Sequence, residues 1–383
     1  MATEIKRETQ DDETLDVELE RLDDFHDIDR PWKPESIRVT TKAFSIRNML
    51  DAMEEDSLDL APDFQRLQVW KPVQKAQLIE SILLQIPLPA FYFAEDTDGT
   101  LRVVDGLQRL STVRDFVKGG DDQRGGFELN GLEYIQDVAG LRFADLPPLW
   151  QRRIHNTQIV ANVIDPSTPT PVMYDIFRRI NTGGTPLNAQ EIRHCMSKPR
   201  SRTFLKELTN LTEFDEATGG ALRRQRRMID REVALRFCAF AVFGPDEYIE
   251  PMDEFLWSVT ERIDRPESIG DRELDELKAR FRRGLKNSYL VFGDHAFRKW
   301  PLGAQRKQPF NRALFESWTV VLSEYSSPAV KKAASRLAKT ARSAMRDDSD
   351  YVSAVTASTG DRRRVRLRFG HAQVMTRSVL GGK

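Results

Sequence analysis

The chain has 383 residues, 58 Lys and Arg against 59 Asp and Glu, and 40% hydrophobic residues, values typical of a globular protein of two or three domains. No apolar run reaches the roughly 18 residues of a membrane span, and the acidic N-terminus lacks the apolar core of a secretory signal. The two cysteines exclude a disulfide scaffold, and the scattered histidines show no zinc-site spacing. We therefore expect a cytoplasmic protein that makes no contact with a membrane.

The charge is unevenly distributed along the chain. Acidic residues gather in 8–29, whereas Lys and Arg dominate 331–383. Residues 1–32 show little periodicity, so we expect an acidic tail that is disordered or weakly helical.

The first predicted elements are a strand, a helix and a loop. Arg38–Phe44 alternates as a strand does, and a helix over Ser45–Glu55 follows, with Ser45 as its N-cap. Pro62 interrupts any further helix, which places Gln65 and Arg66 on a loop or short turn.

A helix and a hairpin are expected next. Lys71-Pro72 opens a helix with an apolar face, and Pro87 and Pro89 end it. Ala90–Ala94 reads as a strand. The turn residues 96–99 separate it from a second apolar run, Leu101–Val104, so the two predict a hairpin.

The second strand of this hairpin leads into a sharp turn and a helix. Asp105-Gly106 forms the turn, and Leu107–Lys118 has helical spacing. A helix N-terminus presents unpaired N–H groups to an anion, and here its first turn also carries Gln108 and Arg109. Asp105 beside them is a candidate base or metal-water ligand. The alternative is a plain strand–helix turn in which Asp105 caps the helix and pairs with Arg109.

The next stretch mixes short elements. Residues 127–129 and 132–134 are candidates for a pair of minor strands, and 146–156 for a helix opened by two prolines. Gln158–Ile164 is β-branched and reads as a strand. A helix ending at Ile180 is then followed by a turn with two glycines.

The residues after that turn predict a capped helix. Asn188 is its N-cap and Glu191 the N3 residue of a capping box. The glycines serve turn geometry on one interpretation. On the other, Asn181, Glu191 and Arg193 project towards a pocket.

From about residue 200 the pattern becomes helical. The expected helices are 201–211, 228–243, 252–263, 271–292, 311–323 and 329–345. Two dense basic runs, Arg223–Arg227 and Arg362–Arg368, either neutralise a nucleic-acid backbone or form solvated faces. We expect three parts: the tail 1–32, a domain 33–198 and a mainly helical domain 199–383.

Four motifs stand in order along the first domain. They are DFQRLQVW at 63–70, LIESILLQIPLP at 78–89, VVDGLQRLST at 103–112 and IFRRINTGGTPLNAQEIR at 176–193. Together they resemble the GmrSD-type N-terminal domain of the ParB/sulfiredoxin superfamily, found in bacterial anti-phage restriction proteins. The resemblance implies an α+β fold, with a ParB-like domain followed by an all-helical one.

The resemblance also implies a nucleotide site. The DGQQR-type motif, which binds and in some members hydrolyses a nucleoside triphosphate, corresponds to 105–109, with Leu107 where the family shows Gln. Helical phasing places Leu107 on the buried face. Gln65 and Arg66 resemble a pair lining the same pocket, and Asn181, Glu191 and Arg193 fall in its N…E region.

Three functions follow as hypotheses. The first is an NTP-hydrolysing defence protein: Arg66 and Arg109 neutralise phosphate, Gln108 orients phosphate or water, and Asp105 holds Mg²⁺ or activates water. The second is a metal-dependent DNA nickase with Asp105, Glu80 and Glu191 as its carboxylates. The third is a nucleotide-switched adaptor without catalysis. Asp294-His295, Asn311 and His371 are too widely spaced for an HNH nuclease site. Any nuclease is then supplied by another chain, a partner nuclease or defence protein, or by the ParB-like pocket itself; a homo-oligomer stays open.

Overall fold

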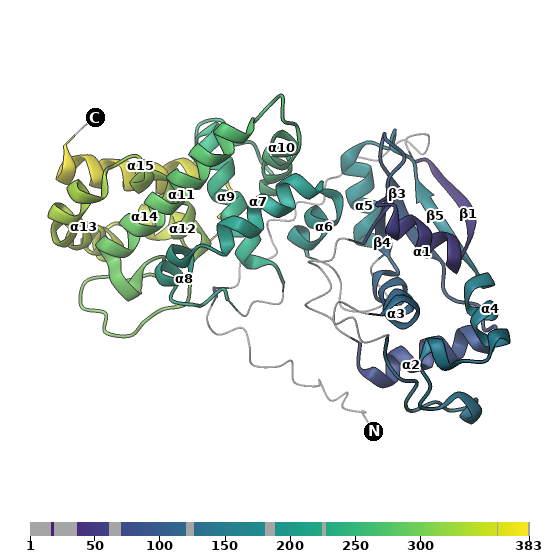
Figure 1. Ribbon diagram of the computed structural model, residues 1–383. Helices are drawn as coiled ribbons and strands as arrows, with labels where there is room; N and C mark the ends of the chain where they lie inside the picture. Colours follow the sequence, from purple (N-terminus) through teal and green to yellow (C-terminus); the bar gives the residue numbers. More distant parts are fainter. Residues whose placement is uncertain are drawn as a thin grey trace, which may run out of the picture. The chain divides into compact units, whose positions relative to one another are not determined.

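The structure is a computed structural model that describes residues 17–18, 37–60, 70–119, 126–180, 188–223, 227–357 and 359–381. The chain divides into two compact units (Figure 1). One unit is Arg30–Met196, called the sheet unit below. The other, the helical unit, combines Ser197–Lys383 with Met1–Asp29. Gln65, Arg66, Asn181 and 224–226 lie outside the described residues.

The sheet unit contains a small mixed sheet with helices around it. Its elements are β1 (Val39–Ser45), α1 (Ile46–Glu54), β2 (Leu58–Asp59), α2 (Pro72–Leu83), β3 (Phe91–Glu95), β4 (Leu101–Asp105), α3 (Leu107–Lys118), the 3-10 turns η4 (Gln136–Val138) and η5 (Phe143–Asp145), α4 (Pro148–Asn156), β5 (Gln158–Ile164), α5 (Thr170–Ile180) and α6 (Ala189–Met196).

The strand order β1-β5-β3-β4-β2 places the predicted hairpin inside the sheet. Strands β3 and β4 pair antiparallel, as expected, with Phe93 opposite Val103. Strand β5 lies between β1 and β3 and pairs with both, antiparallel with β1 and parallel with β3. Because β4 is held on both sides, by β3 and by β2, the turn at its end has a fixed starting point.

Local sequence signals account for several element ends. The hydroxyl of Ser45 accepts a hydrogen bond from the N–H of Asn48 at 3.1 Å, which confirms Ser45 as the N-cap of α1. Strand β5 has the predicted bounds. The apolar faces of α2 and α3 pack with Phe91 and Phe93 into one core, so the strand–turn–helix segment sits directly on the core of the unit.

The prediction of two minor strands is wrong. Residues 127–129 and 132–134 are described and contain no strand. The N–H of Leu129 donates instead to Leu141, and the N–H groups of 133–135 donate to the carboxylate of Glu80. A side chain thus takes the peptide groups that a strand pair would need.

Among its described residues the helical unit consists of helices and their connections, with two isolated β-bridges that join Phe310 to Val17 and to Arg298. Its elements are α7 (Pro199–Thr209), α8 (Thr212–Thr218), α9 (Ile229–Phe243), α10 (Met252–Asp264), α11 (Asp271–Phe292), the 3-10 turn η6 (Gly293–His295), α12 (Arg312–Ser323), α13 (Ser327–Asp347), α14 (Ser349–Ala354) and α15 (Arg362–Leu380).

The six helices expected in this region are all present, and α8, α14 and α15 are additional. In α15 the arginine-rich start obscured the buried positions Val365, Phe369 and Ala372, whose spacing is helical. Two residues of the acidic segment also belong to this unit: Val17 is buried in its core, and the N–H of Glu18 donates to Phe310 at 2.8 Å. The fold class is α+β, as expected, and no described helix combines the length and apolarity needed to cross a bilayer.

Candidate functional site

The turn between β4 and α3 requires glycine. Gly106 has φ +96°, and a Cβ there would lie 2.2 Å from Cδ1 and 2.7 Å from Cε1 of Phe91. Any side chain would therefore clash with a ring that is 2% exposed and cannot move away. The start of α3 is consequently held against β3.

The N-terminus of α3 has backbone donors to offer. Gly106 is the N-cap residue, and it supplies no side-chain cap. The first helical bond runs from the N–H of Leu110 to the carbonyl of Gly106, at 2.9 Å. The N–H groups ahead of Leu110 lie before the helical ladder and add to the positive end of the helix dipole, so this terminus suits an anion.

Arg109 is tightly held by its own unit. Its guanidinium donates to Asp105 Oδ2 at 2.9 Å, to the carbonyl of Ala90 at 3.3 Å and to the carbonyl of Pro89. It also stacks on Phe91, 4.2 Å from the ring centroid. Burial lowers the pKa of Arg109 and the charge of Asp105 offsets part of this, so the group stays cationic.

These contacts match the pairing that the sequence left as an alternative. The Arg109 side chain is 12% exposed, whereas that of Asp105 is 38% exposed. The guanidinium N–H groups of Arg109 therefore bind Asp105 and the backbone of Pro89 and Ala90, whereas the Asp105 carboxylate is partly open to solvent. Phe91 was missed as a site residue, although the register of the expected hairpin places β3 beside the turn.

The other two side chains of the first turn differ in their surroundings. Leu107 packs against the core of the sheet unit. Gln108 is half-buried, and its backbone carbonyl accepts from the Thr112 hydroxyl at 2.7 Å. The core contact of Leu107 follows the helical phasing and accounts for an apolar residue in place of the family's Gln.

The second predicted part of the site is α6. Its capping box is present: the N–H of Asn188 donates to Glu191 at 2.7 Å, and the N–H of Glu191 donates to Asn188 at 2.8 Å. Arg193 is 2% exposed, and its Nε donates to Gln190 at 3.0 Å. The Arg102 guanidinium of β4 donates to the carbonyl of Met196, which ties α6 to the strand that leads to Asp105.

Glu80 has a structural task. Its carboxylate, 3% exposed, accepts from the N–H groups of Glu133, Tyr134 and Ile135 at 3.0, 2.7 and 2.9 Å. Burial would raise the pKa of Glu80, but these donors outweigh it and lower the pKa below 4.5. Glu80 is thus an anchor for a loop.

Among the described residues, no group of three or more His, Cys, Asp or Glu could hold a metal ion. A nuclease site with Asp105, Glu80 and Glu191 as its ligands has no support from this geometry, because the carboxylates of Glu80 and Glu191 both accept from backbone N–H groups. Asp105 is the carboxylate of this set that remains open to solvent.

The first basic run lies partly outside the described residues. Arg223 pairs with Asp215, and 224–226 are not described. The run at 362–368 forms the start of α15, and its members differ in their surroundings. Arg368 is fully buried and pairs with Glu316, so it cannot reach a nucleic acid.

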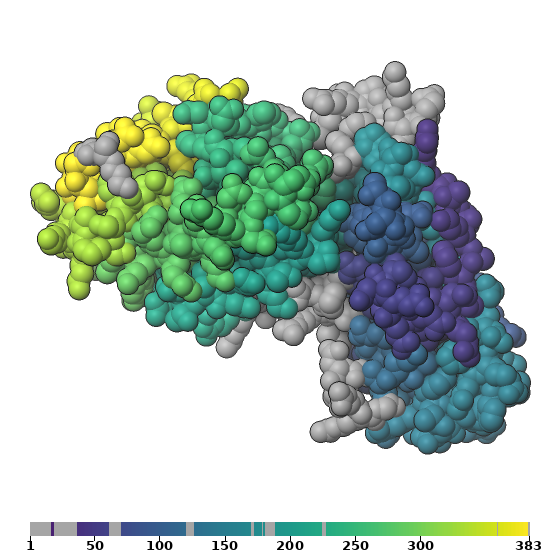
Figure 2. Space-filling model, turned by 45° about the horizontal axis from the view of Figure 1, so that its top comes forward, coloured from purple at the N-terminus to yellow at the C-terminus, as the bar shows by residue number. Residues whose placement is uncertain are grey.

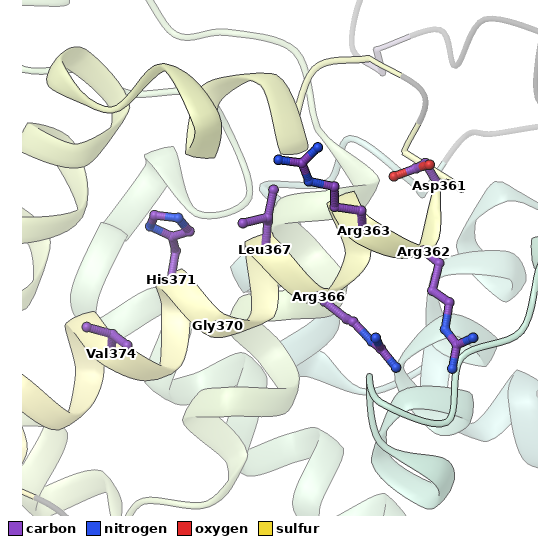
Figure 3. A pocket seen from close by; sticks show the side chains of 8 residues that line it. All are labelled: Asp361, Arg362, Arg363, Arg366, Leu367, Gly370, His371 and Val374. Carbon is purple, nitrogen blue, oxygen red and sulfur yellow. The ribbon is translucent and has the colours of Figure 1, made fainter.

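Three other arginines of α15, Arg362, Arg363 and Arg366, border an open groove of about 720 Å³ (Figure 3). Arg362 and Arg366 extend to one side of the helix, where both donate to the carbonyl of Asp246. Arg363 and His371 point to the other side. Much of the charge of this run is therefore engaged within the helical unit.

The comparisons with known proteins agree with the motifs. Residues 46–197 match the family model described as GmrSD restriction endonuclease, N-terminal domain. No curated protein matches the chain. The match spans the sheet unit from α1 to the end of α6, including the β4–α3 turn. Residues 46–197 are a domain of the GmrSD N-terminal family, and this domain implies that the chain is a component of a restriction or anti-phage system.

Proposed function

We propose that the chain is the nucleotide-binding component of a bacterial restriction system and that it binds a nucleoside triphosphate at the N-terminus of α3. The observation that supports this most is the glycine turn. Gly106 brings the first turn of α3 against Phe91 and leaves it without a side-chain cap. Backbone N–H groups held in this way favour a phosphate.

The side chains around the turn have different roles in this proposal. Gln108 contacts the phosphates, because its amide both donates and accepts hydrogen bonds. Arg109 is a positioning residue: its bonds to Asp105 and to the carbonyl of Ala90 fix the turn, and its charge adds to the local positive potential. Asp105 orients water, or holds a metal, at the solvent side.

The arrangement offers one carboxylate ligand for Mg²⁺. The ion is commonly bound by one or two carboxylates together with substrate phosphates, and Asp105 is the solvent-facing carboxylate beside the turn. When bound, Mg²⁺ would neutralise phosphate charge. The protein's own part is to hold the Asp105 carboxylate by its 2.9 Å bond to Arg109.

The test is a binding titration with ATP, GTP, CTP and UTP, followed by a phosphate-release assay with the nucleotide that binds. We expect Gln108→Ala to weaken binding about tenfold and Arg109→Ala by more, because the turn loses its anchor. Arg114→Ala is the matched control, since Arg114 lies on the same helix and pairs with Asp115. It should bind as the wild type does.

Two results would contradict the proposal. One is no binding of any nucleotide by the folded full-length chain. The other is equal binding and turnover by the wild type and Arg109→Ala. Binding without phosphate release would favour the nucleotide switch, and nicking of a plasmid with Mg²⁺ or Mn²⁺ would favour the nuclease. Thermal unfolding of each variant separates loss of binding from loss of fold.

A further inference from the structure

Helix α13 of the helical unit is rich in basic residues. From Ser327 to Arg346 it has no Asp or Glu. Over the same span it carries Lys331, Lys332, Arg336, Lys339, Arg342 and Arg346. Neither dense run singled out in the sequence includes it, because its cations are spread over about four turns.

The two faces of α13 differ sharply. Val330, Ala333, Leu337 and Ala341 are each at most 3% exposed and pack into the helical unit. The exposed face carries four of the cations: Lys331, Lys332, Arg336 and Lys339. This part of the chain, yellow-green in Figure 2, lies at the surface of the helical unit. The four residues are called the α13 basic face below.

The cations of the α13 basic face differ from most others of the unit in their partners. Within the described part of the chain, none of the four makes an ion pair. The next two cations of the same helix are engaged, since Arg342 stacks on Trp300 at 3.8 Å and Arg346 pairs with Asp347 at 2.7 Å. Elsewhere in the unit, exposed arginines such as Arg272 and Arg282 have carboxylate partners.

We propose that the α13 basic face binds the phosphate backbone of double-stranded DNA. The choice of DNA rests on the proposed role in restriction, whereas the polyanion chemistry rests on the face itself. A lipid surface fits less well, because a membrane-bound helix inserts its apolar face, and that face of α13 is filled by the core.

The spacing of the face suits a backbone. Lys331 to Lys339 span about 12 Å at 1.5 Å per helical residue. Measured along the duplex axis, each strand of DNA has one phosphate per roughly 3.4 Å, so about three or four phosphates of a strand fall within that length. Such contacts carry no sequence information, so the face fixes the protein on DNA and leaves recognition to other residues.

The experiment measures binding of the full-length chain to a fluorescent duplex of arbitrary sequence, without nucleotide, as a function of salt. The variant is Lys332→Ala/Arg336→Ala/Lys339→Ala. The matched control is Arg265→Ala/Arg272→Ala/Arg282→Ala, which removes three exposed arginines of the same unit that pair with carboxylates. Both change the net charge equally.

We expect the α13 variant to bind at least about tenfold more weakly, and the slope of log K against log salt to fall by about 2.7. The control should stay within about twofold of the wild type. Equal weakening in both variants, or none in the α13 variant, would overturn the proposal. So would stronger wild-type binding to anionic lipid vesicles than to the duplex.

This test is independent of the nucleotide site, because the duplex titration contains no nucleotide and the substituted residues all lie in the helical unit. If no nucleotide binds while the α13 variant still binds the duplex more weakly than the wild type, only the proposed nucleotide function is overturned. If a nucleotide binds but the α13 variant keeps the wild-type affinity for the duplex, only the proposal for the α13 basic face is overturned.

Discussion

Arginine and carboxylate meet in both units, but in opposite surroundings. In the helical unit Glu316 and Arg368 are both fully buried, with Arg368 Nε 2.8 Å from Glu316 Oε1. Arg236 approaches the second oxygen of Glu316 at 3.3 Å. In the sheet unit Asp105 and Arg109 are 2.9 Å apart, yet the Asp105 side chain is 38% exposed.

The difference separates a structural ion pair from a site that can exchange partners. Glu316 joins α9, α12 and α15 and has no route to solvent, so its charges serve the fold alone. The Asp105 carboxylate is already in contact with water, so binding a ligand requires little change in its contacts with the protein. Three predictions test this contrast, from the largest expected effect to the smallest.

Glu316→Gln should destabilise the protein most. It leaves Arg236 and Arg368 buried without their shared countercharge, a loss of about 3–5 kcal/mol in the free energy of unfolding. Chemical denaturation monitored by tryptophan fluorescence measures it, since Trp318 lies on the same helix α12. Nucleotide binding by the folded variant should be unchanged. A loss below about 1 kcal/mol would show that the buried Glu316 ion pair is no more important for stability than the exposed Asp105 pair.

Glu80→Gln should have an intermediate effect that depends on pH. The neutral amide accepts more weakly from the three N–H groups, so we expect a loss of about 2 kcal/mol at pH 7. The folded pKa of Glu80 lies below the unfolded value. Its contribution is therefore complete above about pH 4.5 and is lost as the pH falls through the folded pKa.

Unfolding curves of the wild type and Glu80→Gln at several pH values between 7 and 3 check this sign. The two free energies of unfolding should converge towards low pH. A difference that stays constant over this range would show that the charge of Glu80 has no part in holding residues 133–135.

Asp105→Asn should change stability least. The carboxylate is partly exposed, and Arg109 keeps its bonds to the carbonyls of Pro89 and Ala90, so the loss should stay within about 1 kcal/mol. Phosphate release should fall at the same time. A large loss of stability would place Asp105 with Glu316, as a structural residue.

The sequence predicted local features well where one residue type decides the geometry. The N-cap Ser45, the capping box of Asn188 and Glu191, and the glycine turn at Gly106 all depend on neighbours within a few positions. The β3–β4 hairpin followed from its turn and its two apolar runs.

Long-range partners could not be predicted in the same way. Nothing near Glu80 in the sequence indicates that it captures the N–H groups of residues more than fifty positions later, and this contact removed the expected minor strands. Arg368 looked like a surface cation because its run is basic, whereas Glu316 meets it from another helix. The pairing that occupies Arg109 was foreseen as an alternative, but its two carbonyl partners were not.

The pairing of Glu18 with Phe310 and Asn311 has a consequence for folding on the ribosome. Asn311, which donates to the Glu18 carboxylate at 2.8 Å, follows it by 293 positions. Glu18 is synthesised before the sheet unit, and its partners are synthesised only after that unit. Since that unit has its own core, it can fold first and shorten the loop to be closed. A translational pause before residue 310 would then leave Val17 exposed to solvent, because Phe310 would not yet be present to pair with it.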